Sequence, residues 1–386
     1  MKSTLDRRSF LAAGATTVAA ISFGTAVPAQ ARDFRIGFLM PLTGGAGRLG
    51  QMMLEGAQLA VEEVNAGGGV AGRRIELLSE DSQALARNGI DGFRKLVDVN
   101  GTQVIITGWT TVSLAIAPLA TDSKIYLLSG STASPAVRSV SPYFQSTWMY
   151  DDESVKLVLP YARKNLNIAK LGVVTVISDL GTSLSAAIKD EWQRLGGSAI
   201  VEETHQAQEA NFRPMLLKML AEKPDAIYIT SSLGKQAAQI VRQAGDLGYE
   251  GYFLSYGALE DPEVLALGSK AERCIYTSPA CDSASTDPAT KNFVAAFTAK
   301  FGRPPNVHQA NHYDLIKIIQ AVSLPIETAG KTTTGALFRE TLMARFPEYS
   351  GAAGKYRFNF KDGSVLRSTV VKTVKDGAFT KIGDLT

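Results

Sequence analysis

The sequence predicts an α/β fold of two similar lobes, each built on a parallel, doubly wound sheet, with a ligand cleft between them. The first observation is a buried apolar run, residues 36–40, followed by a loop with four glycines and an amphipathic helix. The second is that strand and helix patterns continue to alternate, which indicates a parallel sheet. The third is that the alternation breaks at residues 141–152 and then starts again. A chain of 386 residues also exceeds one ordinary core.

The predicted elements follow in chain order. In the first lobe, strands are expected at 36–40, 73–81, 103–108 and 125–128, and helices at 54–64, 86–99 and 113–123. In the second, strands are expected at 171–177, 199–203, 226–230 and 252–255, and helices at 183–195, 212–221 and 235–247. A further strand follows Cys274, then helical patterns at 289–301, 311–328 and 334–345. Two final strands, 355–360 and 369–374, are expected to be joined by the turn Lys361-Asp362-Gly363.

Residues 1–31 have the composition of a cleaved export signal. Basic residues precede a mildly apolar stretch, and Ala29-Gln30-Ala31 matches the small-x-small cleavage pattern. Arg7-Arg8 within Asp6–Leu11 resembles the twin-arginine motif, with an uncleaved anchor helix as the alternative. We therefore expect a periplasmic protein that is not embedded in the membrane. A formal charge of only +3 gives no nucleic-acid footprint.

Cys274 and Cys281 are the only cysteines. In an oxidising compartment they are expected either to form a disulfide, which requires a chain reversal near Pro279, or to remain two buried thiols.

Two motifs suggest other chemistry. Gly45-x-Gly47-x-x-Gly50 matches the dinucleotide fingerprint, but four residues separate it from its strand, and the next strand-ending acid, Glu80, lies too far along the chain. His308 and His312 have the i, i+4 spacing of zinc ligands, yet the glutamate of that motif is replaced by Gln309, so a structural pair is favoured. Without a nucleophile elbow or paired acid and base, we expect no enzyme, no cofactor and no metal.

Residues at the predicted strand ends suit a small amphipathic ligand, because hydroxyl, amide and aromatic groups gather there. The candidate ligand-binding residues are Arg48, Leu49, Trp109, Thr110, Ser131, Thr132, Ala133, Trp148, Tyr150, Asp151, Asp179, Leu180, Ser232, Tyr256 and Gly257. Arg48 is interpreted as an anion clamp, with a solvated cap as the alternative.

Three stretches resemble the periplasmic solute-binding proteins of ABC transporters, of the branched-chain amino acid (leucine/isoleucine/valine) type. They are IGFLMPLTGGAGRLGQMMLEGAQLAVEEVNAGGGVAGRRIEL, ITGWTTVSLAIAPLATDSKIYLLSGSTASPAV and LLKMLAEKPDAIYITSSLGKQAAQIVRQAGDLGY. The resemblance spans residues 34–375. It implies two Rossmann-like lobes, a three-segment hinge, and closure on a solute that is delivered to a membrane permease. The implied lobes are 32–150 plus about 281–352, and 151–280 plus about 353–386.

The resemblance also bears on the ligand. In that family the first lobe holds the ligand carboxylate through loops that match Trp109-Thr110 and Ser131-Thr132-Ala133. The second lobe of amino-acid binders supplies two tyrosines and a glutamate, where this chain has Leu180, Ser232 and Gly257. A buried ammonium without a carboxylate is costly, so we expect a carboxylate ligand without the α-amino group, with an aromatic or otherwise bulky body. The alternatives are an amino acid held by Asp151 or Asp179, and a sensing module of the same fold.

Overall fold

The computed structural model describes residues 32–197, 200–231, 233–279 and 285–385. The predicted export signal, Ser232 and Cys281 lie outside these ranges. Cys274 is buried, and burial raises the pKa of its thiol to about 12. Because Cys281 lies outside the described residues, the proposed pairing of Cys274 with Cys281 stays a prediction.

The first lobe is built on a five-stranded sheet in the order β2-β1-β3-β4-β5, with every neighbouring pair parallel. Its strands are β1 (Phe34–Met40), β2 (Ile75–Asp81), β3 (Val104–Gly108), β4 (Tyr126–Ser131) and β5 (Phe144–Ser146). Its helices are α1 (Gly47–Ala66), α2 (Ala86–Arg94), α3 (Thr110–Ser123), α9 (Pro288–Phe301), α10 (Val307–Thr328) and α11 (Gly335–Arg345). Ile36, Phe38 and Met40 pack with α1 and α10, whereas Leu39 packs with α2 and α3, so helices cover both faces.

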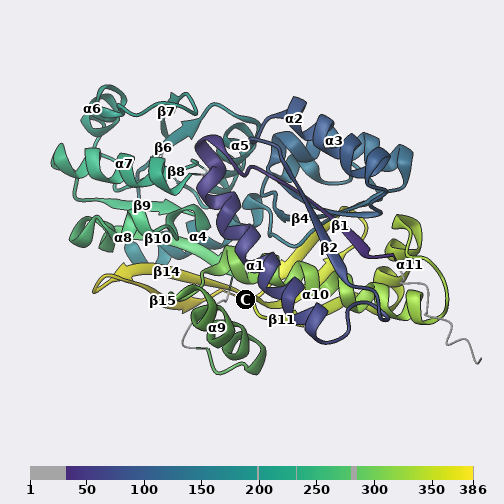
Figure 1. Cartoon of the computed structure of the whole chain (residues 1–386). Helices are drawn as coiled ribbons and strands as arrows, with labels where there is room; N and C mark the ends of the chain where they lie inside the picture. Colours follow the sequence, from purple (N-terminus) through teal and green to yellow (C-terminus); the bar gives the residue numbers. More distant parts are fainter. Residues whose placement is uncertain (1–31, 198–199, 232, 280–284, 386) are drawn as a thin grey trace, which may run out of the picture. The chain divides into compact units, whose positions relative to one another are not determined.

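The second lobe is built on a seven-stranded sheet in the order β15-β14-β10-β9-β8-β6-β7. Its strands are β6 (Leu171–Val176), β7 (Val201–His205), β8 (Ala226–Ile229), β9 (Tyr252–Ser255), β10 (Cys274–Pro279), β14 (Thr369–Lys375) and β15 (Ala378–Asp384). Its helices are α4 (Asp151–Leu166), α5 (Asp179–Arg194), α6 (Arg213–Ala221), α7 (Gly234–Asp246) and α8 (Pro262–Leu265). Strands β6 to β10 are parallel, and β14 and β15 (yellow in Figure 1) extend the sheet antiparallel. The predicted α/β fold of two doubly wound sheets is confirmed.

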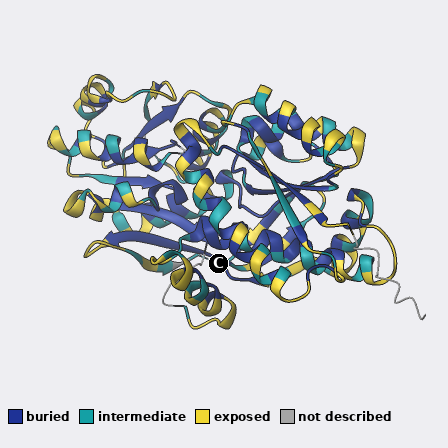
Figure 2. Cartoon of the chain, in the orientation of Figure 1, coloured by how far each residue is buried: buried dark blue, intermediate teal, exposed yellow. Residues whose placement is uncertain are grey.

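Burial explains why the strand patterns could be found in the sequence. The central strands of both large sheets are dark blue in Figure 2, between helices whose outer faces are exposed. In β3, for example, every residue is buried. Such strands are continuous apolar runs, which is the expected signature of a parallel sheet covered on both sides.

The C-terminal part differs from the prediction in its pairing. The turn at Lys361–Gly363 joins β12 (Gly354–Asn359) to β13 (Ser364–Arg367), not to the strand that begins at Thr369. With β11 (Glu348–Gly351) these strands form a small antiparallel sheet. Tyr356, Phe358 and Val365 pack in the core of the first lobe. The chain therefore joins the second sheet only after Arg367, and not at about residue 353 as the lobe boundaries were drawn.

The lobes are connected where β5 leads to α4, where β10 leads towards α9, and between β13 and β14. Arg367 lies at the third connection and is almost fully buried. Its guanidinium donates to the carbonyl of Thr147 at 3.0 Å, beside the first connection, and to Asn311 Oδ1 at 2.9 Å. This buried network ties two connections to helix α10.

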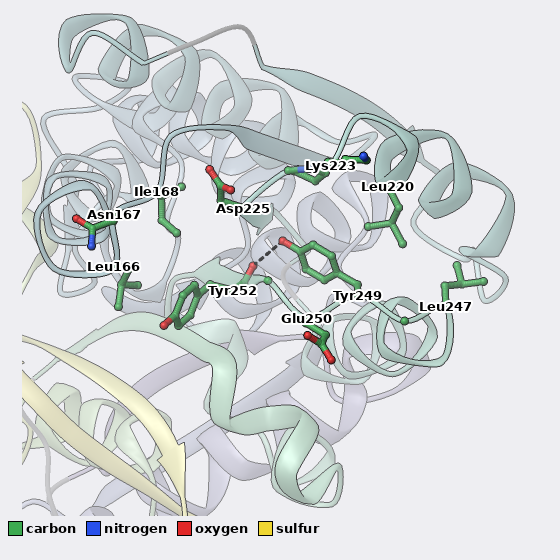
Figure 3. A pocket seen from close by; sticks show the side chains of 13 residues that line it. Leu166, Asn167, Ile168, Leu220, Lys223, Asp225, Leu247, Tyr249, Glu250 and Tyr252 are labelled. Atoms are coloured by element: carbon green, nitrogen blue, oxygen red, sulfur yellow. Dashed lines mark hydrogen bonds between the residues drawn. The ribbon is translucent and has the colours of Figure 1, made fainter.

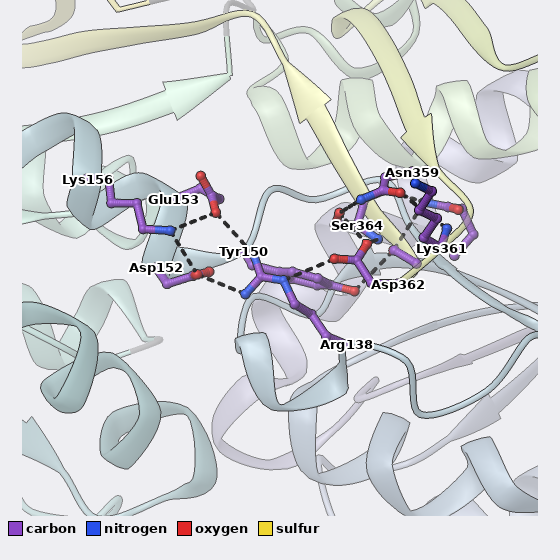
Figure 4. A network of polar contacts seen from close by, with 11 residues as sticks. Arg138, Tyr150, Asp152, Glu153, Lys156, Asn359, Lys361, Asp362 and Ser364 are labelled. Carbon is purple, nitrogen blue, oxygen red and sulfur yellow. Dashed lines mark hydrogen bonds and ion pairs between the residues drawn. The ribbon is translucent and has the colours of Figure 1, made fainter. Parts of the chain in front are cut away.

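A second polar network surrounds the start of α4 (Figure 4). Arg138 pairs with Asp152 at 2.8 Å, with Glu153 at 3.3 Å and with Asp362, in the β12–β13 turn, at 3.4 Å. Its guanidinium also lies 4.9 Å above the ring of Tyr150. The first connection is thus fixed to the small sheet by ion pairs.

Candidate functional site

A cavity of about 550 Å³ lies where the carboxyl ends of strands from both large sheets meet. It contains these residues from the predicted set: Leu49, Trp109, Thr110, Ser131, Ala133, Trp148, Asp179, Leu180, Tyr256 and Gly257. The carboxyl ends of parallel strands share one edge of a sheet, which is why the strand-end reading gathered them correctly. Their ligand contacts stay a prediction.

Three predicted residues lie behind the wall of this cavity instead of in it. Thr132 is fully buried, and its hydroxyl lies 2.6 Å from that of Ser129 and 2.7 Å from that of Ser113. The Tyr150 hydroxyl donates to the carbonyl of Gly363 at 3.1 Å. Asp151 is fully buried beside the cavity, and its N–H donates to the carbonyl of Ala133 at 2.6 Å. These residues support the wall and do not line it.

Arg48 was interpreted as an anion clamp, and its geometry differs from that interpretation. From α1 in the first lobe, its Nη2 atom lies 2.6 and 2.5 Å from the two carboxylate oxygens of Asp261, just before α8 in the second lobe. Arg48 is not among the lining residues, whereas Asp261 is. The guanidinium is therefore engaged by a carboxylate of the protein, and Arg48 joins the two lobes.

One end of the cavity is built to hydrogen-bond an anion. Helix α3 begins at Thr110 with no side-chain cap, so its first N–H groups have no partner within the helix. Trp109, the residue before it, has a φ of 65°, a strained backbone that turns β3 into the helix at this point. The Ser131 hydroxyl is buried and, among the described residues, has no hydrogen-bond partner. Together these donors suit a carboxylate.

Two of the three second-lobe carboxylates that line the cavity are paired with cations, Asp261 with Arg48 and Glu260 with Lys372. Glu260 lines the cavity, just beyond a short turn after β9, so the chain does carry a glutamate after this strand, although the sequence placed Gly257 there. Its Oε1 accepts from Lys372 Nζ at 2.8 Å and its Oε2 from the Ser278 hydroxyl at 2.6 Å. Both members of the ion pair are buried, with side-chain exposures of 6% and 5%. Glu260 is thus already satisfied as an acceptor.

Asp179 is the remaining carboxylate among the described lining residues. It lies exposed in the first turn of α5 and accepts a hydrogen bond from the Thr111 hydroxyl at 3.1 Å. No lysine or arginine occurs among the described residues that line the cavity.

The aromatic part of the cavity wall includes His308, which the sequence predicted to be a purely structural residue. The imidazole of His308 stacks on Trp148 with ring centroids 5.0 Å apart and planes at 6°. Burial lowers the pKa of His308 to about 4, although Glu260 and Asp261 oppose that shift, so the ring is neutral at pH 7. Its Nδ1 has no partner among the described residues. His312, one turn on, is fully buried and lies edge-on to Phe38.

The glycine fingerprint has a structural explanation. A Cβ atom on Gly50 would lie 1.8 Å from the carbonyl oxygen of Pro41, so only glycine lets α1 approach the preceding loop. Asp81, at the end of β2, holds that loop by accepting from the N–H of Leu42 at 2.8 Å. Gly50 therefore serves close packing of α1 against the loop, whereas a Cβ atom at Gly45 would meet nothing within 4 Å.

A second hollow, of about 590 Å³, lies at the opposite ends of the second sheet (Figure 3). Leu166, Lys223 and Tyr249 line it, and the Tyr249 hydroxyl donates to the carbonyl of Tyr252 at 3.3 Å. Because it lies at the amino-terminal ends of the parallel strands, where α/β proteins do not bind their ligands, we do not assign a function to it.

The described part of the chain has neither a membrane-spanning helix nor a cluster of metal-binding side chains. No helix there is both long and apolar enough to cross a membrane. Nor do three or more histidine, cysteine, aspartate or glutamate side chains gather there as they would around a metal ion.

Two sheets with a cavity at their carboxyl edges define a solute-binding protein of two lobes. A family model described as "Periplasmic binding protein" matches residues 33–378. The chain belongs to this family, whose members and structural neighbours are solute-binding proteins and not enzymes.

Individual relatives are similar over most of their length. The Leu/Ile/Val-binding protein BraC3 of Rhizobium johnstonii is 24% identical, over 82% of this chain and 84% of its own. The crystal structure of the leucine-binding protein LivK from Thermotoga maritima has a TM-score of 0.83 at 26% identity and covers 91% of this chain and 98% of its own. A solute-binding protein of Rhodopseudomonas palustris in complex with 3,4-dihydroxybenzoic acid has a TM-score of 0.81 at 23% identity, covering 91% and 97%.

Proposed function

We propose that the protein is the extracytoplasmic solute-binding component of an ABC importer, and that its solute is a small organic acid without an α-amino group. The lobes close on the acid, and the loaded protein delivers it to a membrane permease. The predicted binding residues of the cavity wall, together with Glu260 and His308, form the site.

The observation that carries this proposal is the Glu260–Lys372 pair. An amino acid needs a carboxylate for its ammonium, and burying an ammonium without one costs several kcal/mol. Glu260 is positioned for that role, but Lys372 and Ser278 already occupy its oxygens. The opposite end of the cavity offers the donors of Ser131 and the start of α3 to a carboxylate. The cavity thus supports an anion better than a zwitterion.

The aromatic wall favours an acid with a flat or bulky apolar body. Trp109, Trp148 and Tyr256 line the cavity, and His308 extends the Trp148 surface. Aromatic faces bind rings by stacking. The Rhodopseudomonas palustris neighbour in complex with 3,4-dihydroxybenzoic acid is an example of this fold holding an aromatic acid.

A branched-chain or other amino acid is the second candidate, and Asp179 is the observation in its favour. No ion pair of Asp179 occurs among the described residues, so its carboxylate is available to an ammonium at the cavity rim. The BraC3 and LivK relatives carry the names of leucine binders.

Calorimetric titration of the exported form with benzoate, 4-hydroxybenzoate, leucine and valine separates the two candidates. We expect an aromatic acid to bind and the amino acids to give no heat. Ser131→Ala should weaken the acid about tenfold or more, because a hydrogen bond to a charged group is lost. Ser123→Ala is the matched control, since Ser123 is exposed at the far end of α3. Tight leucine binding that Asp179→Asn abolishes would replace the proposal with the amino-acid candidate.

Transport and location belong to the same proposal. The export motif in residues 1–31 and the family support a periplasmic protein that leaves the cytoplasm by the twin-arginine route. Capture of a membrane permease by the loaded protein, and not by the empty one, would separate import from a sensing role.

A further inference from the structure

We propose that the solute carries an elongated apolar body that covers the exposed side chains of Leu85 and Ile177. The solute class is then a monocarboxylate with a long chain or several rings, not a compact acid. This inference rests on the proposed function, because it takes the carboxylate end of the ligand as given.

The exposure of these two side chains is the first observation. Leu85 is 53% exposed and Ile177 is 51% exposed, and both line the cavity. They come from different lobes: Leu85 lies between β2 and α2, and Ile177 directly follows β6. A single exposed leucine needs no explanation. Two large, half-exposed apolar side chains, one from each lobe, thus line one cavity, and we call them the apolar rim. A ligand that covers them would remove this apolar surface from water.

Much of the remaining lining of the cavity is apolar, although Gln83, Ser178, Gln208 and Gln236 also contribute to it. The apolar lining residues are Leu49, Met52, Met53, Ala84, Val176, Leu180 and Leu233. Methionine side chains adapt their shape to different apolar partners. Since no lysine or arginine occurs among the described lining residues, a second anionic group on the body of the ligand would find no counter-ion.

The cavity volume is the second observation. At about 550 Å³ the cavity falls within the roughly 300–1,000 Å³ typical of pockets for drug-sized ligands, which are larger than leucine or benzoate.

This volume is not that of two separated lobes, because the lobes touch at several points. Arg48 reaches Asp261, the Thr111 hydroxyl reaches Asp179 at 3.1 Å, and the hydroxyls of Ser134 and Ser183 lie 2.6 Å apart. The space remains while the lobes are in contact, so we expect a ligand of benzoate size to leave part of it unfilled.

The test is a titration of the full exported protein with butanoate, octanoate, dodecanoate and benzoate, below the concentrations at which micelles form. We expect Kd to fall by about fourfold for each added methylene until the chain reaches the rim, because each becomes buried. Leu85→Ser and Ile177→Ser should each weaken dodecanoate by about tenfold and leave benzoate and butanoate unchanged. Leu366→Ser is the control, since Leu366 is 57% exposed on β13 and does not line the cavity.

The outcomes separate the two proposals. If benzoate or butanoate binds and affinity does not rise with chain length, the elongated ligand is wrong and the proposed function stands. It is equally wrong if the two rim variants leave dodecanoate unchanged or weaken benzoate as much as dodecanoate. If no carboxylate of the series binds, both proposals fail.

Discussion

Asp151 carries a fully buried carboxyl group at the connection between β5 and α4. Neither of its side-chain oxygens has a hydrogen-bond partner among the described residues. Burial, with a further contribution from Asp152, raises the pKa of Asp151 well above its usual range. A buried ionised carboxylate without a partner is costly, so the group remains protonated to higher pH in the folded protein than in the unfolded chain.

This shift gives the pH dependence a definite sign. Between pH about 3.9, the pKa of an aspartate in the unfolded chain, and the higher pKa of the folded protein, Asp151 is protonated only in the folded state. Raising the pH through this range therefore lowers the free energy of unfolding. Asp151→Asn removes the titration. We expect its Tm to exceed that of the parent by about 2–4 °C at pH 8 and to show no gain at pH 4 in thermal unfolding.

The neighbouring variant Asp152→Asn is the control. Asp152 pairs with Arg138 at 2.8 Å, and loss of this ion pair should lower Tm. A gain for Asp151→Asn that is the same at every pH would contradict the explanation.

At the level of single residues, the sequence predicted most of the cavity-wall residues from their position at or just after the end of a strand. Trp109, Ser131 and Tyr256 were found in that way. His308 was not, because it enters from the first turn of α10 and its chain distance from the strands hides the contact. Ile177 is the last residue of its predicted strand, and Leu85 lies four residues beyond the end of β2, so neither was predicted to line the cavity.

Helices α1 and α10 pack together in the first lobe, and Gly56 determines how closely they approach. A Cβ atom at Gly56 would lie 2.1 Å from the carbonyl oxygen of Gln309. Because that neighbour is backbone, one helix must move. We expect Gly56→Ala to destabilise the protein by about 1–3 kcal/mol in denaturant unfolding, although alanine is the better helix former.

Gly45→Ala is the matched control, because a Cβ there meets nothing within 4 Å. Equal stability of the two variants would show that the helices separate without cost.

At the level of elements, the sequence predicted those with a clear period and missed those without one. The predicted break at residues 141–152 covers only the start of α4, and no element was predicted over residues 153–166. The helix contains Pro160 and has three acidic residues in its first turn, which obscure its apolar period. Helix α3 starts at Thr110, three residues before its predicted start, because Trp109 reverses the backbone without a typical capping residue. Strand β13 was missed because only its contacts with β12 distinguish it from a turn.

Arg48 and Asp261 concern the whole molecule, because their ion pair joins the lobes. We expect Arg48→Ala to raise the Kd of the solute by about two- to fivefold, the size of an exposed ion pair that supports the closed form. Asp261→Asn should act similarly, and the double variant should be no worse than either. Calorimetry at low and high salt measures this, and salt should reduce the effect.

Arg35→Ala is the control, since Arg35 pairs with Glu76 inside one lobe at a similar exposure of 49%. A much larger loss for Arg48→Ala that persists in the Asp261→Asn background would restore the interpretation of Arg48 as a direct anion clamp.

For the whole molecule, the sequence predicted two doubly wound sheets because each strand carries its own apolar signal. The path of the chain between the lobes has no such signal. The C-terminal part of the chain was expected to cross from the first lobe to the second. The point at which it crosses, after Arg367, is fixed by long-range hydrogen bonds of the Arg367 guanidinium to Thr147 and Asn311. No local pattern encodes such contacts.

The wall that holds Trp109 and Trp148 has an optical consequence. The chain has three tryptophans, and these two line the cavity, whereas Trp192 is buried in the core of the second lobe under the guanidinium of Arg163. Two of the three indoles therefore lie at the cavity, and the stacked imidazole of His308 lies against one of them. If a solute occupies the cavity as proposed, we expect it to change the fluorescence of these two tryptophans, with Trp192 in the core as an internal reference.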